Sequence, residues 1–242
     1  MHNKKIPPIF LCLAVFALCV SCTARINGSL LADGRADLNV YAALEPRITM
    51  LIGGLAVASG MVAPGTPLLS GPAISTSMSA APGVESASLV NRTAAAVEGP
   101  VRISRLSDFL AIASSSGDFI NFEQGTPAQG GRCSINLSLA SGPQIIALLS
   151  SEIGEYLAAL MAPLATGERL TQVEYLNLVT SVYGRGIADE IAQAGIRVTI
   201  ELPGQVQSVR GGTFSGRNAE FAIPLLDLLV LETPLSYEIR WR

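Results

Sequence analysis

The residues that could do chemistry are few, because the only histidine and both lysines of the chain are His2, Lys4 and Lys5. After those positions every cation is an arginine. The rest of the chain therefore lacks the usual general base of serine and cysteine hydrolases and the commonest metal ligand. It also lacks the amine that Schiff-base chemistry and Ser-Lys dyads require. These classes of catalysis are excluded for residues beyond Lys5.

Carboxylate chemistry stays open, since a glycosidase needs only two acids across a cleft, one of them with a raised pKa. The acids considered for this role are Glu152, Glu155, Glu168 and Glu174. Glu152 and Glu155 fall on a predicted helix, where acids usually form a solvated face, and Glu174 has the spacing of a helix-capping residue. Asp189 and Glu190, near a helix end, are interpreted as surface charge. We therefore expect no catalytic residue and keep a carboxylate-based hydrolase as the alternative.

Neither a metal site nor a nucleic-acid site is indicated. Zinc would need Cys133 together with carboxylates, because the sequence has no CxxC pair, and it has no glycine-rich phosphate loop. The arginines are scattered and the formal net charge is −3, so the basic patch of a nucleic-acid binder is missing. We expect no metal, no cofactor and no nucleic-acid partner.

The N-terminus has the three-part layout of an export signal. Lys4 and Lys5 precede an apolar run from Ile9 to Val20, and the small residue Ser21 closes it. That run is too short to cross a bilayer of about 30 Å as a helix. We predict that residues 1–21 are a signal peptide and that residues 22–242 form the mature chain.

The segment Cys19-Val20-Ser21-Cys22 resembles the lipobox of bacterial lipoproteins. The resemblance implies that Cys22 is acylated on sulfur, becomes the first mature residue and anchors the protein to a membrane. The family usually has leucine three places before this cysteine, where this chain has Cys19. Ordinary secretion is the alternative interpretation.

Two further expectations follow from acylation of Cys22. Cys12 and Cys19 would leave with the signal, so Cys133 has no intramolecular disulfide partner. Thr23 is not the aspartate that commonly retains such lipoproteins in the inner membrane. The resemblance therefore implies a lipid-anchored protein of the cell envelope, on the outer membrane and facing the periplasm.

An uncharged block runs from Ile48 to Val84. Residues 48–63 predict an apolar helix in which Gly53, Gly54 and Ala58 allow close packing. Residues 64–84 predict a Gly/Pro/Ser-rich loop, and residues 86–97 a second short helix. Three roles for the block stay open: a core element, a membrane-contacting or ligand-lining element, and a membrane span.

The other patterns predict a single α+β domain over residues 22–242. Residues 26–42, with a turn at Asp33-Gly34, are typical of a hairpin, and Cys133 to Ala140 alternates as a half-buried strand with Cys133 inward. Residues 143–162 and 171–195, the latter starting with a capping box at Thr171, predict an antiparallel helical pair. With strands at 101–104, 118–123 and 196–241, we expect an antiparallel sheet of N-terminal, central and C-terminal strands, covered on one face by helices.

The closing segment, with Pro203-Gly204, Val206, Gly211-Gly212 and Phe221, resembles the closing hairpin of the LppM-type bacterial lipoprotein domain. This resemblance concerns architecture, and no lipid-binding role is carried over from it. The function is instead inferred from an apolar α+β domain that has few chemically reactive residues and is tethered to a membrane: we expect a membrane-anchored envelope lipoprotein that binds an apolar or lipidic ligand or another envelope component. The alternatives are a carboxylate-based hydrolase of envelope glycans and a purely structural lipoprotein. The sequence names no ligand-binding residue.

Overall fold

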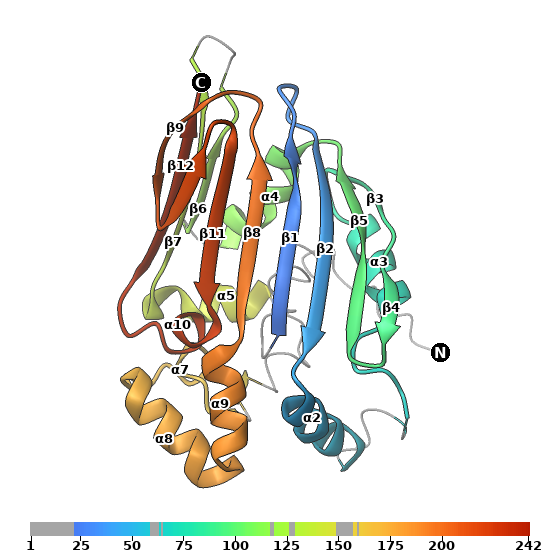
Figure 1. Ribbon diagram of the computed structural model, residues 1–242, viewed down its shortest axis with the longest axis vertical. Helices are drawn as coiled ribbons and strands as arrows, with labels where there is room; N and C mark the ends of the chain where they lie inside the picture. The colour runs from blue at the N-terminus through green and yellow to red at the C-terminus, as the bar shows by residue number, and fades with distance from the viewer. Residues whose placement is uncertain are drawn as a thin grey trace.

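The computed structural model describes residues 22–58, 63, 65–116, 119–125, 129–148, 157–158 and 160–242. Two β-sheets and a set of helices form this part of the chain (Figure 1), which confirms the predicted α+β class. The larger sheet has the strand order β10-β11-β8-β1-β2-β5-β3, with β4 also paired to β5. Its strands are β1 (Cys22–Leu30), β2 (Ala36–Leu44), β3 (Val84–Ala87), β4 (Val90–Thr93), β5 (Ala96–Ile103), β8 (Gly195–Glu201), β10 (Gly212–Ser215) and β11 (Asn218–Pro224).

The smaller sheet has the order β6-β7-β12-β9. Its strands are β6 (Ile120–Glu123), β7 (Gly131–Leu137), β9 (Val206–Arg210) and β12 (Leu235–Trp241). Gly211, with φ of +76°, is the one residue between β9 and β10, so the chain passes there from one sheet to the other. We expected one sheet and the structure has two, because an alternating pattern shows which side chains face inward but not which strand is the neighbour.

The N-terminal hairpin is confirmed. Ile26 lies opposite Val40 and Leu30 opposite Ala36, and Gly34 has φ of +85° in the connecting turn. On its other side β1 pairs with β8 in parallel, from Thr23 opposite Gly195 to Ser29 opposite Glu201. The expectation of a purely antiparallel sheet is therefore wrong at this pair. A parallel neighbour requires a long crossover, and the helical middle of the chain supplies it.

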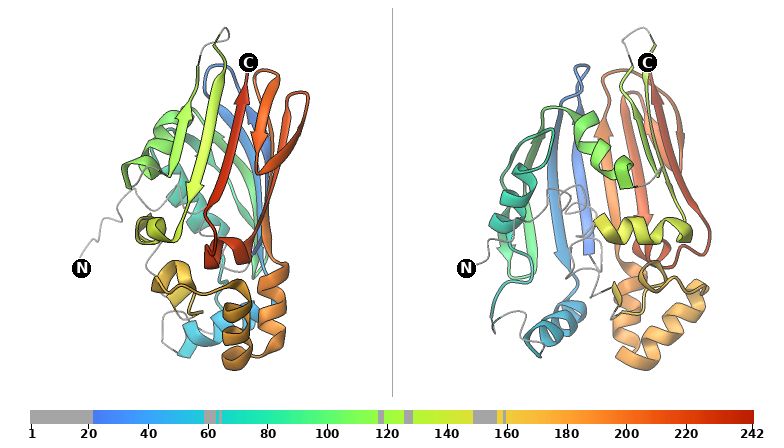
Figure 2. Two further views of the ribbon diagram at one scale, coloured as in Figure 1. Left: turned by 90° about the vertical axis from the view of Figure 1, so that its left-hand side faces the viewer. Right: turned by 180° about the vertical axis from the view of Figure 1, so that it is seen from behind.

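The helices lie behind the larger sheet and at its lower end as Figure 1 draws it. They are α2 (Pro46–Ala58), α3 (Gly71–Ser79), α4 (Leu106–Ser116), α5 (Gly142–Leu148), α7 (Pro163–Thr166), α8 (Gln172–Tyr183), α9 (Arg185–Gln193) and α10 (Leu225–Val230), with a 3-10 turn, η2, at Leu139–Ser141. Seen from behind in Figure 2, α3, α4 and α5 cover one face of the sheet. The described helices leave the other face, which we call the open face, uncovered, and its side chains Arg25, Asn39 and Glu220 are exposed.

The uncharged block contains more regular structure than predicted. Helix α3 forms inside the expected loop 64–84, because Ser70 Oγ accepts a hydrogen bond from Ala73 N at 3.3 Å and Pro72 occupies the first turn, where its missing N–H is not needed. Residues 86–97 were predicted as a helix and instead belong to β3, β4 and β5. Antiparallel pairing with β5 outweighs the weak helix propensity of this Ser-, Val- and Thr-containing stretch.

The segment 171–195 begins as predicted and then breaks. Thr171 Oγ1 accepts from Glu174 N at 3.2 Å and Glu174 Oε2 accepts from Thr171 N at 2.8 Å, which confirms the capping box. Gly184, with φ of +89°, ends this helix, so the predicted single helix is two, α8 and α9, which pack against each other. Of the predicted helix 143–162, residues 149–156 and 159 lie outside the described residues.

The described helices are all too short or too polar to cross a membrane. The core lies between the sheets and helices, where Tyr175, Ile48, Met78 and Ile103 are among the largest fully buried side chains. The uncharged block thus contributes Ile48 and Met78 to the core. This agrees with the core interpretation for part of the block.

Candidate functional site

Cys22, the predicted lipidation site, is the first residue of β1. Its backbone lies opposite Leu44 near the end of β2, and helix α2 begins at Pro46, two residues after Leu44. Position 22 is therefore part of the sheet and lies beside the start of α2. If residue 22 begins the mature chain, no flexible spacer separates a lipid on it from the folded domain. Acylation of Cys22 stays a prediction.

Helix α2 is apolar on both of its sides. Ile48, Ile52 and Ala56 are buried, as the spacing of an inward stripe requires. On the outer side Met50 is 69% exposed, Leu55 39% and Val57 40%. Arg47 is the one charged residue of the helix, which is about 20 Å long. Exposed apolar side chains on a helix next to the predicted anchor are suited to contact with the interface of a bilayer.

Glu190 of α9 holds the first turn of α2. Arg47 N donates to both carboxylate oxygens of Glu190, at 3.1 and 3.0 Å, and Ile48 N donates to Oε2 at 3.0 Å. A carboxylate here satisfies amides that the helix leaves unpaired and complements the positive end of its dipole. The interpretation of Glu190 as plain surface charge is therefore wrong. The neighbouring Asp189 is exposed, and its Oδ2 lies 3.9 Å from Nε of the exposed Arg185, as expected of surface charge.

A hollow of about 410 Å³ opens on the open face beside the predicted anchor. It is lined by the start of β1, the end of α9, the start of β8 and the end of β11. We call it the arginine hollow, because Arg25 and Arg197 both line it. The two arginines lie directly opposite each other in the parallel β1–β8 register, so their side chains point to the same face.

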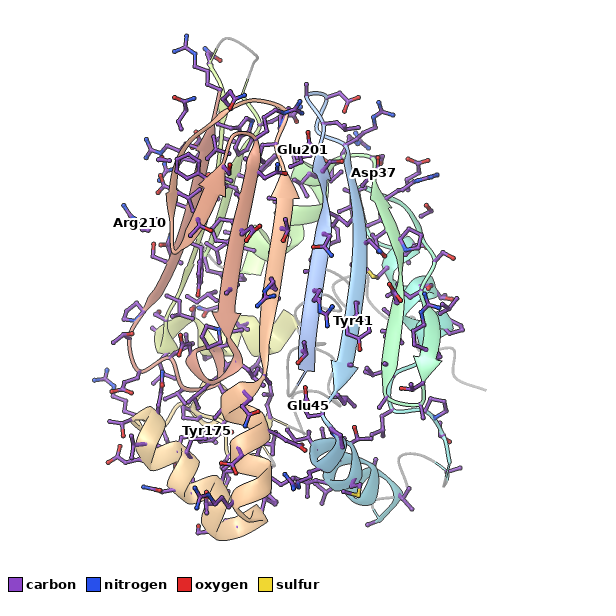
Figure 3. The ribbon with its side chains drawn as sticks, in the orientation of Figure 1. Asp37, Tyr41, Glu45, Tyr175, Glu201 and Arg210 are labelled. Carbon is purple, nitrogen blue, oxygen red and sulfur yellow. The ribbon has the colours of Figure 1, made fainter. Side chains whose placement is uncertain are left out.

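The neighbours of Arg25 orient it without neutralising it. Its guanidinium carbon lies 5.3 Å from the ring centroid of Tyr41, a cation–π contact on the open face (Figure 3). Thr23, on the same strand, donates from Oγ1 to Glu45 Oε1 at 2.9 Å. Tyr41 lies in β2 and Glu45 directly follows this strand, so the polar groups of β1 are held from the side of β2.

Sequence reasoning did not identify the arginine hollow. Arg25 and Arg197 each occupy an outward position of an alternating strand, which is where a solvated arginine is expected. Only the parallel pairing of β1 with β8 places them side by side. The available signal was weak: each arginine has a polar or small residue two positions away on its strand, and no acid.

The candidate catalytic acids do not form a described site. Glu168 and Glu174 are exposed, and Glu152 and Glu155 lie outside the described residues. Hydrogen bonds from the Thr171 backbone N–H and hydroxyl lower the pKa of Glu174 below its usual value. A general acid needs the opposite shift. Glu174 is thus engaged in capping α8.

A second hollow, of about 430 Å³, is lined by Glu174 and Glu232 near the start of α8. Glu232 Oε2 accepts from Gln172 N at 2.9 Å. Both carboxylates therefore accept hydrogen bonds from backbone amides at the N-cap and the first residue of α8. Among the described residues, acids, cysteines and histidines nowhere gather in a group of three that could hold a metal ion.

Cys133 lies in β7, opposite Ile239 of β12 and Phe122 of β6. It is half-buried and packs against the core cluster, as the strand pattern predicted. Burial raises the pKa of the Cys133 thiol to about 11. The group is therefore a protonated thiol at neutral pH, which makes it a poor nucleophile.

Comparison with known proteins adds one likeness of fold. No family model matches the chain, and no curated protein matches it in sequence. Among solved structures, it is similar to the NMR structure of the folded domain of the LppM protein of Mycobacterium tuberculosis. The TM-score is 0.41 with 11% sequence identity, and the match covers 92% of this chain and 90% of that one. A likeness at this level assigns no functional residue here.

Proposed function

We propose that this protein is a lipid-anchored protein of the cell envelope that acts by binding an apolar or lipidic ligand or another envelope component. The observation that carries the proposal is the position of Cys22. It follows a signal-like segment in the sequence and is the first residue of β1. Acylation at this position would hold the end of the sheet directly against the bilayer.

The surroundings of Cys22 support this orientation. Met50, Leu55 and Val57 of α2 are exposed and apolar, and α2 follows the strand position that faces Cys22. An interfacial helix beside the anchor would fix the tilt of the domain relative to the bilayer. The same proposal places the protein on the outer membrane, facing the periplasm. This part rests on Thr23, which occupies the position where an aspartate commonly retains lipoproteins in the inner membrane.

The anchor is tested with matched cysteine variants. Bacteria producing the full chain are fed an alkyne-bearing fatty acid, and the protein is purified and coupled to a dye. The native chain and Cys133→Ala should carry the dye, whereas Cys22→Ala should not. Equal labelling of the Cys22→Ala protein would reject acylation at this residue.

The two binding modes differ in their readouts. A lipidic ligand should raise the melting temperature of the detergent-purified protein when phospholipids are added, since a ligand that binds only the folded state stabilises it. A protein component should instead appear as one defined complex after crosslinking in intact cells. If neither effect is seen, the purely structural role is favoured.

The hydrolase alternative receives no support from the described acids. Glu174 is a capping residue with a lowered pKa, and Glu168 is exposed. Hydrolysis of a glycan would require acids other than Glu168 and Glu174. Release of reducing sugar from purified envelope glycans by the native protein would support the hydrolase alternative.

A further inference from the structure

We propose that the arginine hollow binds a phosphate-type anion between Arg25 and Arg197. The observation behind this proposal is that two cations occupy one concave site on adjacent strands. Like charges directly opposite each other destabilise a sheet. An oxyanion between the two guanidinium groups would convert that repulsion into two charge-assisted contacts.

Three acids of the open face already pair with other arginines. Asp37 pairs with Arg102 at 3.8 Å, Glu98 with Arg92 at 2.7 Å, and Glu201 with Arg217 at 3.3 Å. Figure 3 shows Asp37 and Glu201 on the same face as Tyr41, toward the opposite end of the strands from Glu45. These three carboxylates are thus bound to arginines outside the hollow.

The remaining acids near the hollow do not pair with its arginines. Glu220 lies opposite Thr199 in the β11–β8 register, whereas Arg197 lies opposite Ala222. Glu45 accepts from Thr23. Within the described part of the chain, neither Arg25 nor Arg197 has a carboxylate within 4.0 Å, while most other arginines do. The hollow therefore carries two positive charges that its own walls do not neutralise.

The geometry suits an oxyanion with several acceptor atoms. A guanidinium group presents its N–H donors in a planar fork that fits phosphate in a bidentate manner. Tyr41 restricts one of the two forks through its cation–π contact, which lowers the cost of ordering Arg25 on binding. At about 410 Å³ the hollow admits a phosphate ester with its substituent and not only a bare ion.

Two sources could supply this phosphate. Thr23, the residue after the predicted lipid site, also lines the hollow, so the headgroup of a neighbouring phospholipid is within reach if Cys22 is acylated. That source rests on the proposed function. A soluble phosphate ester is the other source, and its binding would not depend on the anchor.

The test uses the full chain, produced in bacteria and purified in detergent, and compares Arg25→Gln, Arg197→Gln and Arg210→Gln. Arg210 is an exposed arginine of β9 on the other sheet, so its variant removes one charge without touching the hollow (Figure 3). Binding of radiolabelled inorganic phosphate and of glycerol phosphate is measured by equilibrium dialysis. Cosedimentation is measured with vesicles of neutral phospholipid and with vesicles containing a phosphate-monoester lipid.

We expect Arg25→Gln and Arg197→Gln each to weaken binding about tenfold, as loss of a charge-assisted hydrogen bond does, and Arg210→Gln to leave it unchanged. Binding of inorganic phosphate or glycerol phosphate identifies a soluble source. Stronger binding to the monoester vesicles than to the neutral vesicles, without binding of the soluble probes, identifies a headgroup. Both outcomes support the site. Failure of all these probes, or equal weakening by Arg210→Gln, overturns it.

The same measurements on Cys22→Ala separate this proposal from the anchor. Binding of inorganic phosphate and of glycerol phosphate in the dialysis should be unaffected by this change. Phosphate binding by a native chain that carries no acyl group would reject the anchor and keep the site. An acylated native chain that binds none of the phosphate probes would keep the anchor and reject the site.

Discussion

Cys22 lies opposite Leu44 in the antiparallel pairing of β1 with β2. This one contact brings the predicted lipid site, the first turn of α2 and the arginine hollow to the same end of the larger sheet. Here the sheet itself would be attached, so its orientation relative to the membrane would be restricted.

Helix α2 should depend on Glu190 for stability. Glu190→Ala removes the carboxylate that accepts from Arg47 N and Ile48 N, so we expect the free energy of unfolding to fall by about 1 kcal/mol, as for loss of a helix cap. Urea unfolding followed by circular dichroism measures this. Asp189→Ala is the matched control and should change it by less than half as much, because an exposed ion pair contributes little.

The exposed side of α2 should promote vesicle binding. Replacing Met50 and Leu55 by serine removes exposed apolar surface, so partitioning of the unacylated Cys22→Ala protein onto phospholipid vesicles should fall about tenfold or more. The control replaces Val90 and Phe214, which are also exposed and apolar, and should retain binding. Equal partitioning of the two double variants would show that α2 does not contact the bilayer.

Tyr175 connects α8 to the segment that precedes α7. Its side chain is fully buried, and its hydroxyl donates to the Leu160 carbonyl at 3.2 Å. Tyr175→Phe leaves that carbonyl without this donor, so we expect the unfolding free energy to fall by about 1 kcal/mol. Chemical denaturation measures the loss, and unchanged stability would show that water replaces the hydroxyl.

Acid should destabilise the fold through Glu238. Hydrogen bonds from Arg240 and Arg132 lower the pKa of this carboxyl below its usual value of 4.5. The stabilisation is present above that value and is lost as pH falls through the lower pKa of the folded state. Unfolding in urea between pH 6 and 3 should show stability falling with pH, and Glu238→Gln should flatten the decrease. Glu220→Gln, an exposed acid without an ion pair among the described residues, should keep the native slope.

Cys133 should resist thiol reagents while the protein is folded. With its pKa raised to about 11, the thiolate fraction at pH 8 is about a hundredfold below that of an ordinary cysteine. Mass spectrometry of the Cys133 peptide after brief treatment with N-ethylmaleimide should find it unmodified. The same treatment in guanidinium should modify it fully, and rapid labelling of the folded protein would contradict its burial.

Local patterns predicted what local chemistry determines. The hairpin around Asp33-Gly34, the strand that contains Cys133 and the capping box at Thr171 all follow from residues close in sequence, and all three are present. The strand ends at Leu137 and not at Ala140 as predicted, because Leu139–Ser141 form a 3-10 turn. The α+β class followed from the order of these elements.

Long-range pairing determined the rest. Glu190 caps a helix 142 residues earlier in the chain, and Arg25 meets Arg197 only through the parallel β1–β8 register. No periodic pattern carries either relationship. Gly184 ends a helix that we predicted to continue to residue 195. The prediction missed this end because the sequence does not show whether a glycine adopts a positive φ or is tolerated inside a helix.

The intact mass of the protein extracted from bacterial membranes tests the central claim most directly. Cleavage before Cys22 and acylation predict a mass that equals residues 22–242 plus the acyl groups, with fragmentation placing the addition on the first residue. A mass that equals the uncleaved chain, or a shortened chain without acyl groups, would contradict the proposed anchor.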